Sequence, residues 1–421
     1  MPVRRVRRKT VVGAVLVAAI AGTLGAAPVM ASATADPGRH PAGGHDATQA
    51  AMDANVKAGV PGVLGRAQDA RGAWSGSSGV ADLTTDRPRR PADRFRIGSI
   101  TKTFIATVVL QLEKEKKLGL DDTVDSWLPG VVEGHGHDGR AITVRQLLNH
   151  TSGIYNYTED PAFQKKYLTK GFLEHRYDTL TPKQLVAVAM RHKPLFEPGS
   201  AWTYSNTNYV LAGMIVEKAT GRSYASEIER RIIRPLGLRA TTLPGTKASM
   251  PSPHGRAYGK LDTAPDAEIH DVTELNPSWG GAAGEMVSSA GDLNRFHRAL
   301  LDGKLLPEGQ LKKMLTTVPT GGEEPFARYG LGISPSKLSC GKEIWGHTGG
   351  IHGSISVAGV TRDGRHSAAF NLNGDWVGDV LLPMEGEFCG TLPEKPEKGE
   401  AKTFRKPWEP MTAGVRPADA R

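Results

Sequence analysis

Three short motifs with residue types suited to hydrolytic chemistry occur in order along this chain of 421 residues. They are Ser99-Ile100-Thr101-Lys102, Tyr204-Ser205-Asn206 and His347-Thr348-Gly349. Each pattern alone is short enough to occur by chance in an exposed turn. Because all three occur together, they predict one composite site assembled from distant parts of the chain.

Ser99 and Lys102 form the part of this site that could carry covalent chemistry. An i, i+3 spacing places both side chains on one face of a helix. A serine hydroxyl needs a neighbouring base to take its proton, and a lysine can be that base where burial or a second cation lowers its pKa. With Ser99 at the start of a helix, backbone N–H groups and the positive end of the helix dipole would also point toward a developing oxyanion. We therefore expect an acyl-enzyme at Ser99.

The other two motifs supply candidates for proton transfer and substrate contact. Tyr204 is the expected second proton carrier, which moves a proton toward the leaving group. Asn206 can point back into the same cleft and hold the substrate amide. His347 and Thr348 are expected on the opposite strand, where they would orient the scissile group.

The motifs resemble those of the superfamily of serine D-alanyl-D-alanine peptidases and class C β-lactamases, whose members carry S-x-x-K, Y-x-N and K/H-T-G. The histidine form of the third motif is similar to that of the soluble exported D-alanyl-D-alanine carboxypeptidases. The resemblance covers about residues 47–391, and the further matching segments are Phe95–Gly98, Leu147–Tyr155, Glu197–Gly199, Tyr329–Gly332, Leu338–Gly341 and Phe388–Gly390.

This resemblance implies a fold, a function and a set of site residues. The fold would be α/β (α+β), a β-lactamase/transpeptidase-like mixed sheet flanked by helices, with an inserted helical subdomain. The protein would be an exported, monomeric D-alanyl-D-alanine carboxypeptidase, acting on peptidoglycan stem peptides through an acyl-enzyme and acylated by β-lactams, with no cofactor and no metal. The implied residues are the backbone N–H groups of Ser99 and Gly350 in an oxyanion hole, Gly349 in the substrate-binding strand, Trp279 and Phe163 as cleft-lining aromatics, and a Cys340–Cys389 disulfide.

Two positions depart from the pattern of the soluble carboxypeptidases. Gly350 stands where they carry a hydroxyl residue after H-T-G, and Ser334 stands where they carry an arginine. Both positions bind the terminal carboxylate of the substrate in that family, and Lys337 would lie on the opposite face of the strand from Ser334. The departures favour weak discrimination between a free carboxylate and an amide or ester. An esterase or class C-like β-lactamase on the same scaffold, and a penicillin or peptidoglycan sensor that does not deacylate, remain alternatives.

The first 35 residues have the pattern of a secretory signal peptide. Five basic residues between Arg4 and Lys9 precede an apolar run from Val11 to Ala27, and small residues at 31–35 fit an A-x-A cleavage site. The run is short for a membrane span and is interrupted by glycines, so we expect cleavage rather than an uncleaved anchor. The mature protein would then be secreted or cell-wall-associated.

Composition and cysteine content limit the remaining possibilities. Without residues 1–35, the formal charge of +9 falls to 48 basic against 44 acidic residues, and no basic stripe with interleaved aromatics predicts nucleic-acid binding. The two cysteines would form a disulfide in an oxidising compartment more readily than they would remain buried thiols. We expect a flexible leader at 36–46, one hydrolase domain at 47–391 and a disordered tail at 392–421.

Hydrophobic periodicity predicts strands at both ends of the domain and helices between them. A helix should begin at Ser99, with Phe104, Val108 and Leu112 on one face, and another should end at Gly221. One sheet would then be built from both ends of the chain around a helical region at roughly 115–240. The expected strands are 62–69, 74–82, 329–333, 343–347, 354–360 and 366–372, and the second helix is 206–219.

Overall fold

The computed structural model of the protein describes residues 44–262, 264, 266–323 and 326–393. The predicted signal peptide, and most of the predicted leader and tail, lie outside these residues. Helix α1 (Asp46–Lys57) begins next to the expected start of the hydrolase domain, and α14 (Leu382–Cys389) ends close to its expected end. No helix in the described part of the chain is long and apolar enough to span a membrane.

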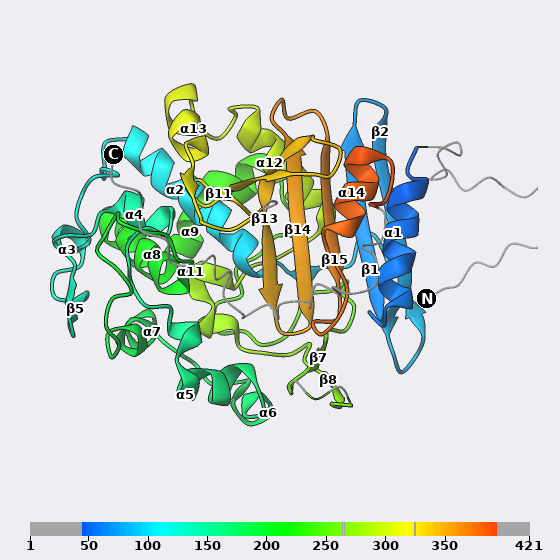
Figure 1. Cartoon of the computed structure of the whole chain (residues 1–421), viewed down its shortest axis with the longest axis horizontal. Coiled ribbons are helices and arrows are strands. Elements are labelled where there is room, and N and C mark those ends of the chain that lie inside the picture. Colours follow the sequence, from blue (N-terminus) through cyan, green and yellow to red (C-terminus); the bar gives the residue numbers. More distant parts are fainter. Residues whose placement is uncertain (1–43, 263, 265, 324–325, 394–421) are drawn as a thin grey trace, which may run out of the picture. The chain divides into compact units, whose positions relative to one another are not determined.

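A seven-stranded sheet joins the two ends of the domain, as predicted (Figure 1). Its strand order is β12-β13-β14-β15-β1-β2-β3, and the central pairing joins Val63 of β1 to Leu372 of β15. Every pairing within this sheet is antiparallel. The strands are β1 (Gly62–Asp69), β2 (Gly72–Asp82), β3 (Arg87–Pro88), β12 (Ser334–Lys337), β13 (Glu343–Ile351), β14 (Ser354–Thr361) and β15 (Ser367–Leu372).

Helices cover both faces of this sheet because its strands are apolar on both faces. Successive residues of β1 show the alternation: Val63 packs with Met52 of α1 and Met384 of α14, whereas Leu64 joins the larger cluster on the other face. That larger cluster also contains Phe104, and it is formed with α2 (Thr101–Lys114), α8 (Asn206–Thr220) and α12 (Ala290–Leu301). The sheet is therefore the middle layer of three (Figure 1).

The helical region predicted at roughly 115–240 lies within the chain between β3 and β12, which also contains short strands. Helix α8 starts at Asn206 and ends at Thr220, and the next residue, Gly221, has a φ of +67°, the left-handed conformation that glycine adopts at helix ends. The other helices and turns are η1 (Gly98–Ile100), α3 (Val124–Trp127), α4 (Val144–Leu148), η2 (Tyr157–Glu159), α5 (Pro161–Phe163), η3 (Gln164–Leu168), α6 (Phe172–His175), α7 (Pro182–Ala189), α9 (Tyr224–Ile228), η4 (Glu229–Ile233), α10 (Arg234–Leu236), η5 (Pro277–Trp279), α11 (Gly281–Gly284) and α13 (Glu308–Leu315).

Short two-stranded pairs complete the fold, and one of them corrects a prediction. The strand expected at 329–333 does not form: β11 ends at Tyr329, and β12 begins only at Ser334. Between them Gly332 has a φ of +71°, and a Cβ there would lie 2.7 Å from the Ala106 side chain of α2. The chain therefore turns tightly over α2 instead of continuing straight. The short pairs are β4 (Phe95–Arg96) with β9 (Val287–Ser288), β5 (Glu133–Gly134) with β6 (His137–Asp138), β7 (Tyr258–Lys260) with β8 (Ile269–Asp271), and β10 (Val318–Pro319) with β11 (Arg328–Tyr329).

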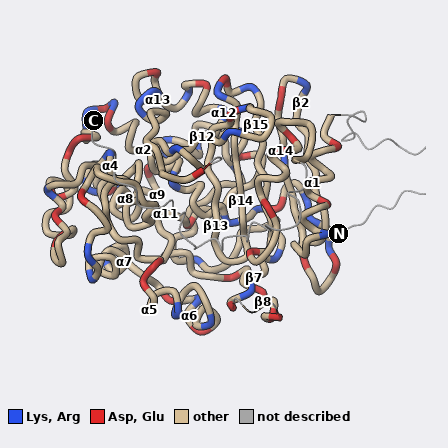
Figure 2. The backbone as a smooth tube through the Cα atoms, in the orientation of Figure 1, with Lys and Arg blue, Asp and Glu red and all other residues tan. Residues whose placement is uncertain are grey.

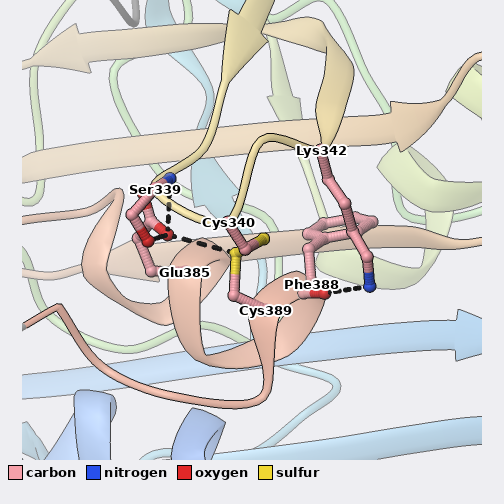
Figure 3. Close-up of a disulfide and its surroundings, with 6 residues drawn as sticks. All are labelled: Ser339, Cys340, Lys342, Glu385, Phe388 and Cys389. Carbon is pink, nitrogen blue, oxygen red and sulfur yellow. Dashed lines mark hydrogen bonds between the residues drawn. A yellow bond between two sulfur atoms is a disulfide. The ribbon is translucent and has the colours of Figure 1, made fainter.

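A disulfide ties the β12–β13 turn to the end of α14, which confirms the predicted pairing (Figure 3). The Cα atoms of Cys340 and Cys389 lie 5.7 Å apart. Beside the disulfide, the Ser339 hydroxyl donates to Glu385 Oε2 at 2.7 Å, and Lys342 Nζ donates to the Phe388 carbonyl at 2.6 Å. The edge of the sheet that carries β12 and β13 is thus fixed to α14.

Candidate active site

Ser99 lies in the single turn η1 that leads directly into α2. Lys102 is one helical turn further on, and its Nζ lies 2.9 Å from Ser99 Oγ. The predicted i, i+3 arrangement therefore places an amine within hydrogen-bond distance of the hydroxyl. This is the geometry in which the amine can accept the hydroxyl proton.

Lys102 is fully buried, and its polar neighbours are uncharged. Its Nζ lies 2.8 Å from Asn206 Oδ1 and 2.7 Å from the Ala283 carbonyl oxygen. Burial without a carboxylate partner holds the pKa of Lys102 well below its usual value. An uncharged amine has two protons and one lone pair, and both of those oxygens can only accept. The lone pair is then left for the Ser99 hydroxyl.

Tyr204, just before α8, is the second side chain that contacts Ser99. Its hydroxyl is hydrogen-bonded to Ser99, and burial raises its pKa above the usual value. Lys102 Nζ lies 4.8 Å from the centre of the Tyr204 ring. Tyr204 therefore holds its proton at neutral pH and can donate it to a group at Ser99.

His150 supports the back of the Tyr204 ring. The two ring centres lie 4.3 Å apart, and His150 Nδ1 accepts hydrogen bonds from the Ser205 N–H and from Asn208 Nδ2, both at 3.2 Å. Burial holds the pKa of His150 well below its usual value. An uncharged imidazole thus positions the Tyr204–Asn206 turn.

Glycines allow β13 to lie against the Ser99 turn. A Cβ on Gly349 would lie 1.9 Å from the Ile97 carbonyl oxygen, and a Cβ on Gly98, whose φ is +49°, would lie 2.7 Å from the Gly350 nitrogen. Only glycine permits this approach. Ser99 and Gly350 therefore border the same cavity, as an oxyanion hole formed by their backbone N–H groups would require.

The cavity beside Ser99 encloses about 550 Å³, part of it open to solvent. Trp279 forms one wall, and the Tyr157 hydroxyl donates to its carbonyl oxygen at 2.5 Å. None of the residues that line it carries a cationic or anionic side chain. The lining residues are Ser99, Asn156, Tyr157, Thr158, Tyr204, Asn206, Trp279, Gly280, Ala283, Gly284, Gly350 and Ile351.

Motif analysis missed the wall formed by residues 156–158. Asn156 Oδ1 accepts the backbone N–H of Asn206 at 3.0 Å, and Asn206 Nδ2 donates to Thr158 Oγ1 at 3.2 Å. The amide oxygen of Asn206 thus accepts a hydrogen bond from Lys102, and its amide nitrogen donates one to Thr158 in the cavity wall. These residues directly follow the matching segment Leu147–Tyr155, and that adjacency was the available signal.

His347 and Thr348 do not border the cavity at Ser99 but a second hollow along the same strand. His347 Nε2 lies 2.8 Å from the Tyr329 hydroxyl, and burial lowers the pKa of His347 to about 3. Tyr329 packs edge-on against Tyr204 at 6.4 Å between ring centres. The motif histidine therefore contacts Tyr204 both directly, at 6.4 Å between ring centres, and through Tyr329, which the sequence analysis placed in a matching segment without giving it a role.

Phe163 is not a cleft-lining aromatic, so this prediction is wrong. It is buried in the main hydrophobic cluster and packs edge-on against Tyr157 at 5.1 Å. A single sequence cannot distinguish a buried apolar position from one that lines a cleft, because both favour a large aromatic residue.

The position expected to bind a substrate carboxylate is occupied by a serine that has internal partners. Ser334 Oγ donates to the Arg328 carbonyl oxygen at 2.8 Å. The Arg328 guanidinium itself pairs with Glu343 at 2.6 Å. Ser334 is buried and Lys337 is exposed, so the two side chains lie on opposite faces of β12, as predicted.

No group of three or more His, Cys, Asp or Glu side chains in the described residues could hold a metal ion.

The three-layer fold, together with a serine whose hydroxyl contacts a buried lysine and a tyrosine, defines a serine hydrolase of the kind found among β-lactamases and penicillin-binding proteins.

Comparisons with known proteins place the chain in the same class of protein. The family described as Beta-lactamase matches residues 46–377, and the chain belongs to this family. Penicillin-binding protein 4* of Bacillus subtilis (strain 168) is 31% identical over 295 residues, which is 66% of this chain and 60% of that protein. The chain thus spans about three fifths of that relative.

Two solved structures are similar over most of their length. A D-stereospecific amidohydrolase from Streptomyces sp. is 60% identical, with a TM-score of 0.79 over 82% of this chain and 99% of that one. The D-amino acid amidase from Ochrobactrum anthropi SV3 is 30% identical, with a TM-score of 0.69 over 80% of this chain and 93% of that one.

Proposed function

We propose that the protein is a serine amidohydrolase that cleaves amides and esters of D-configured acyl groups through an acyl-enzyme at Ser99. The observation that carries this proposal is a cavity bordered by the nucleophile Ser99 and the acid Tyr204, with the base Lys102 buried behind Ser99, and with no cation among the described residues that line it. Such a site suits a substrate whose leaving group is uncharged. The similarity to a D-stereospecific amidohydrolase supports the same substrate class.

The geometry supports a balanced acylation step. Ser99 Oγ attacks the substrate carbonyl carbon while its proton moves to Lys102 Nζ, 2.9 Å away. The carbonyl oxygen gains negative charge and is stabilised by the backbone N–H groups of Ser99 and Gly350. Tyr204 donates its proton to the leaving nitrogen or oxygen, the bond to the carbonyl carbon breaks, and Lys102 returns a proton to Tyr204.

Deacylation reverses these roles with water as the nucleophile. The water oxygen attacks the ester carbon, its proton passes to the Tyr204–Lys102 pair, and Ser99 Oγ leaves with a proton. The acid is released and the site returns to its starting state. No cofactor is required for any of these proton transfers.

A carboxylate behind the cavity wall suggests how the acyl group is recognised. Glu159 accepts a hydrogen bond from Asn156 Nδ2 at 3.2 Å, and burial raises its pKa. We propose that the free α-ammonium of a D-aminoacyl group lies on this side of the cavity. Capping the substrate amine with an acetyl group should then raise KM about tenfold or more, and Glu159→Gln should remove most of that difference.

A D-alanyl-D-alanine carboxypeptidase acylated by β-lactams is the second candidate. It is favoured by the similarity to a penicillin-binding protein. The disulfide also suits an exported protein, and we propose secretion or cell-wall association after removal of residues 1–35. Peptidoglycan stem peptides would then be the natural substrates.

One experiment tests the proposal and separates the two candidates. D- and L-phenylalanine amide, and an N-acylated peptide ending in D-alanyl-D-alanine, are incubated with wild type and Ser99→Ala, and products are quantified. We expect ammonia from the D-amide at least about a hundredfold faster than from the L-amide, and none with Ser99→Ala. Preference for the peptide would favour the carboxypeptidase. Full activity of Ser99→Ala would overturn both.

A further inference from the structure

A third hollow, separate from the catalytic cavity, is lined by four arginines. It encloses about 310 Å³, part of it open to solvent, and shares no lining residue with the cavity at Ser99. The four are Arg89, Arg94 and Arg96, from the segment that leads to the Ser99 turn, and Arg256. None of the described residues that line the hollow is Asp or Glu. Its wall therefore carries positive charge and no carboxylate.

Arg96 lies at the end of β4 and is only 3% exposed. Its Nη2 donates to three backbone carbonyl oxygens, those of Ala248 at 2.8 Å, Leu275 at 3.0 Å and Thr273 at 3.4 Å. Its Nε and Nη1 are buried and have no hydrogen-bond acceptor among the described residues. Most of the donor capacity of this guanidinium is therefore unused by the fold.

Arg89 is the second buried arginine of the hollow and is also 3% exposed. Its Nη2 donates to Asn371 Oδ1 at 2.7 Å and its Nη1 to the Gly62 carbonyl oxygen at 3.3 Å, while its Nε has no acceptor in the described part of the chain. Asp93, a near neighbour in sequence, pairs with Arg87 at 3.5 Å. Strand β15, which carries Asn371, and its neighbour β14 have no charged residue (Figure 2), so the sheet supplies no countercharge either.

Both buried guanidinium groups stay charged at neutral pH. Burial lowers the pKa of Arg89 and of Arg96, in each case only to about 10. Among the described residues, Glu274 and Glu285 act on Arg96 through space, and neither is ion-paired with it. A buried cation with unused N–H groups needs acceptors or a countercharge to offset its lost hydration. An anion in the hollow would supply both.

Arg94 and Arg256 are the more exposed arginines of the hollow, and their charges differ in pairing. Arg256 forms ion pairs with Asp82 and Asp271, so its charge is already balanced. Arg94 Nη2 donates only weakly, to the Arg239 carbonyl oxygen at 3.4 Å, and no carboxylate of the described residues pairs with it. Arg94 therefore adds a third cation without a countercharge at the rim.

We propose that this hollow binds a phosphate-type oxyanion. Arginine N–H groups match the several oxygens of a tetrahedral oxyanion, and three guanidinium groups without ion pairs line one cavity. Its volume is about ten times the roughly 30 Å³ that one water occupies in the liquid, so an ion of this size fits. The inference is independent of the proposed function, because the site stands whether or not Ser99 is acylated.

Occupancy would strengthen the strand that precedes the nucleophile. Arg96 is three residues before Ser99, and its carbonyl oxygen accepts from the Ser354 hydroxyl at 2.7 Å. An anion held by Arg96 would add a contact to this strand without entering the catalytic cavity. We therefore expect the ligand to raise the melting temperature of the protein and to leave its catalytic constants nearly unchanged.

Calorimetric titration of the whole protein at neutral pH and constant ionic strength tests the site. Inorganic phosphate, glycerol 3-phosphate and acetate are the three probes. We expect one phosphate per chain with a Kd of about 1 mM or tighter, and acetate bound at least about tenfold more weakly. The phosphate that binds more tightly, free ion or ester, identifies the source of the ligand.

Two variants and a matched control assign the binding to the arginines. Arg94→Gln should weaken phosphate binding about tenfold or more, because one charge-assisted contact is lost. Arg96→Gln should abolish it. Arg222→Gln makes the same change of charge at an exposed arginine between α8 and α9 that does not line the hollow, and should bind phosphate as wild type does. All three should hydrolyse D-phenylalanine amide within about twofold of wild type.

The site assignment is overturned if phosphate gives the wild type neither binding heat nor a rise in melting temperature, or if Arg94→Gln and Arg222→Gln bind it equally well. Acetate bound as tightly as phosphate would contradict the ligand class. Because Arg94 lies at the rim, its variant decides the matter should Arg96→Gln fail to fold. Failure of the proposed function would appear separately, as a wild type that binds phosphate and does not hydrolyse the D-amide.

Discussion

Two buried ionisable groups in this protein differ in their hydrogen-bond partners. Lys102 lies in α2, on the face of the sheet that α2, α8 and α12 cover, and has only uncharged polar partners: a hydroxyl, an amide oxygen and a backbone carbonyl. Glu387, in α14 on the other side, accepts hydrogen bonds from His45 at 2.8 Å and Thr48 at 2.9 Å, and contacts His366 at 2.7 Å. Lys102 therefore has no countercharge, whereas Glu387 has three hydrogen-bond partners, two of them histidines.

The difference appears in the direction of each pKa shift. Burial holds the pKa of Lys102 well below its usual value. Burial alone would raise the pKa of Glu387, but hydrogen bonds from His366, His45 and Thr48 lower it instead. A buried amine without a countercharge loses its proton readily and can then act as a base, whereas a paired buried carboxylate joins α1, α14 and the β14–β15 turn. The pairing of a buried charge thus separates a reactive group from a structural one.

Removing the amine gives the largest expected effect. Lys102→Met should lower kcat/KM for a D-amide by about a thousandfold, because Ser99 loses its base. The melting temperature should not fall, because a buried group without a countercharge is replaced by an apolar one of similar length. Steady-state kinetics and thermal unfolding check both. A large loss of stability would show that the three oxygens around Lys102 are a structural network.

Tyr204→Phe should have the next largest effect. Without its hydroxyl the leaving group receives no proton, and acylation should slow by about a hundredfold or more while ligand binding is retained. Stopped-flow acylation with a chromogenic ester and equilibrium binding of a D-amino acid separate the two. Wild-type rates in this variant would mean that Lys102 alone carries the proton.

The pH profile of the wild type should follow Lys102. Only the uncharged amine can accept the Ser99 proton, so kcat/KM should fall about tenfold per pH unit below the pKa of Lys102 in the folded protein. That pKa lies well below 10.5, so activity should persist far below the usual titration range of lysine. A profile that rises only above pH 10 would contradict the proposed base.

The core of the site could be predicted because its parts obey local rules. Ser99 and Lys102 meet through helical periodicity, and Tyr204 and Asn206 share the turn that starts a helix, so the lengths of the intervening loops do not matter. The disulfide needed only an even count and an oxidising compartment.

Contacts between distant segments could not be predicted, because no local sequence pattern indicates them. The Ala283 carbonyl that accepts from Lys102 is a backbone atom and carries no residue signature. The break between β11 and β12 depends on the close approach of Gly332 to α2, which alternating apolar residues cannot indicate. His347 was assigned to substrate contact from its motif, whereas its nitrogen is engaged by Tyr329.

The smallest effect on activity is expected from the paired carboxylate. Glu387→Gln keeps the shape but weakens the hydrogen bonds to His45 and His366, and should lower the free energy of unfolding by about 1–3 kcal/mol at neutral pH, with kcat/KM within about twofold of wild type. Because the pKa of Glu387 is lowered on folding, the unfolded state binds more protons between that value and about 4.5. The stabilisation is therefore complete above pH 4.5 and is lost as the pH falls through this window. Urea unfolding of both proteins from pH 7 to 3 should show the wild-type advantage shrinking with acid. A constant difference would mean that packing of α14, rather than charge, is what Glu387 supplies.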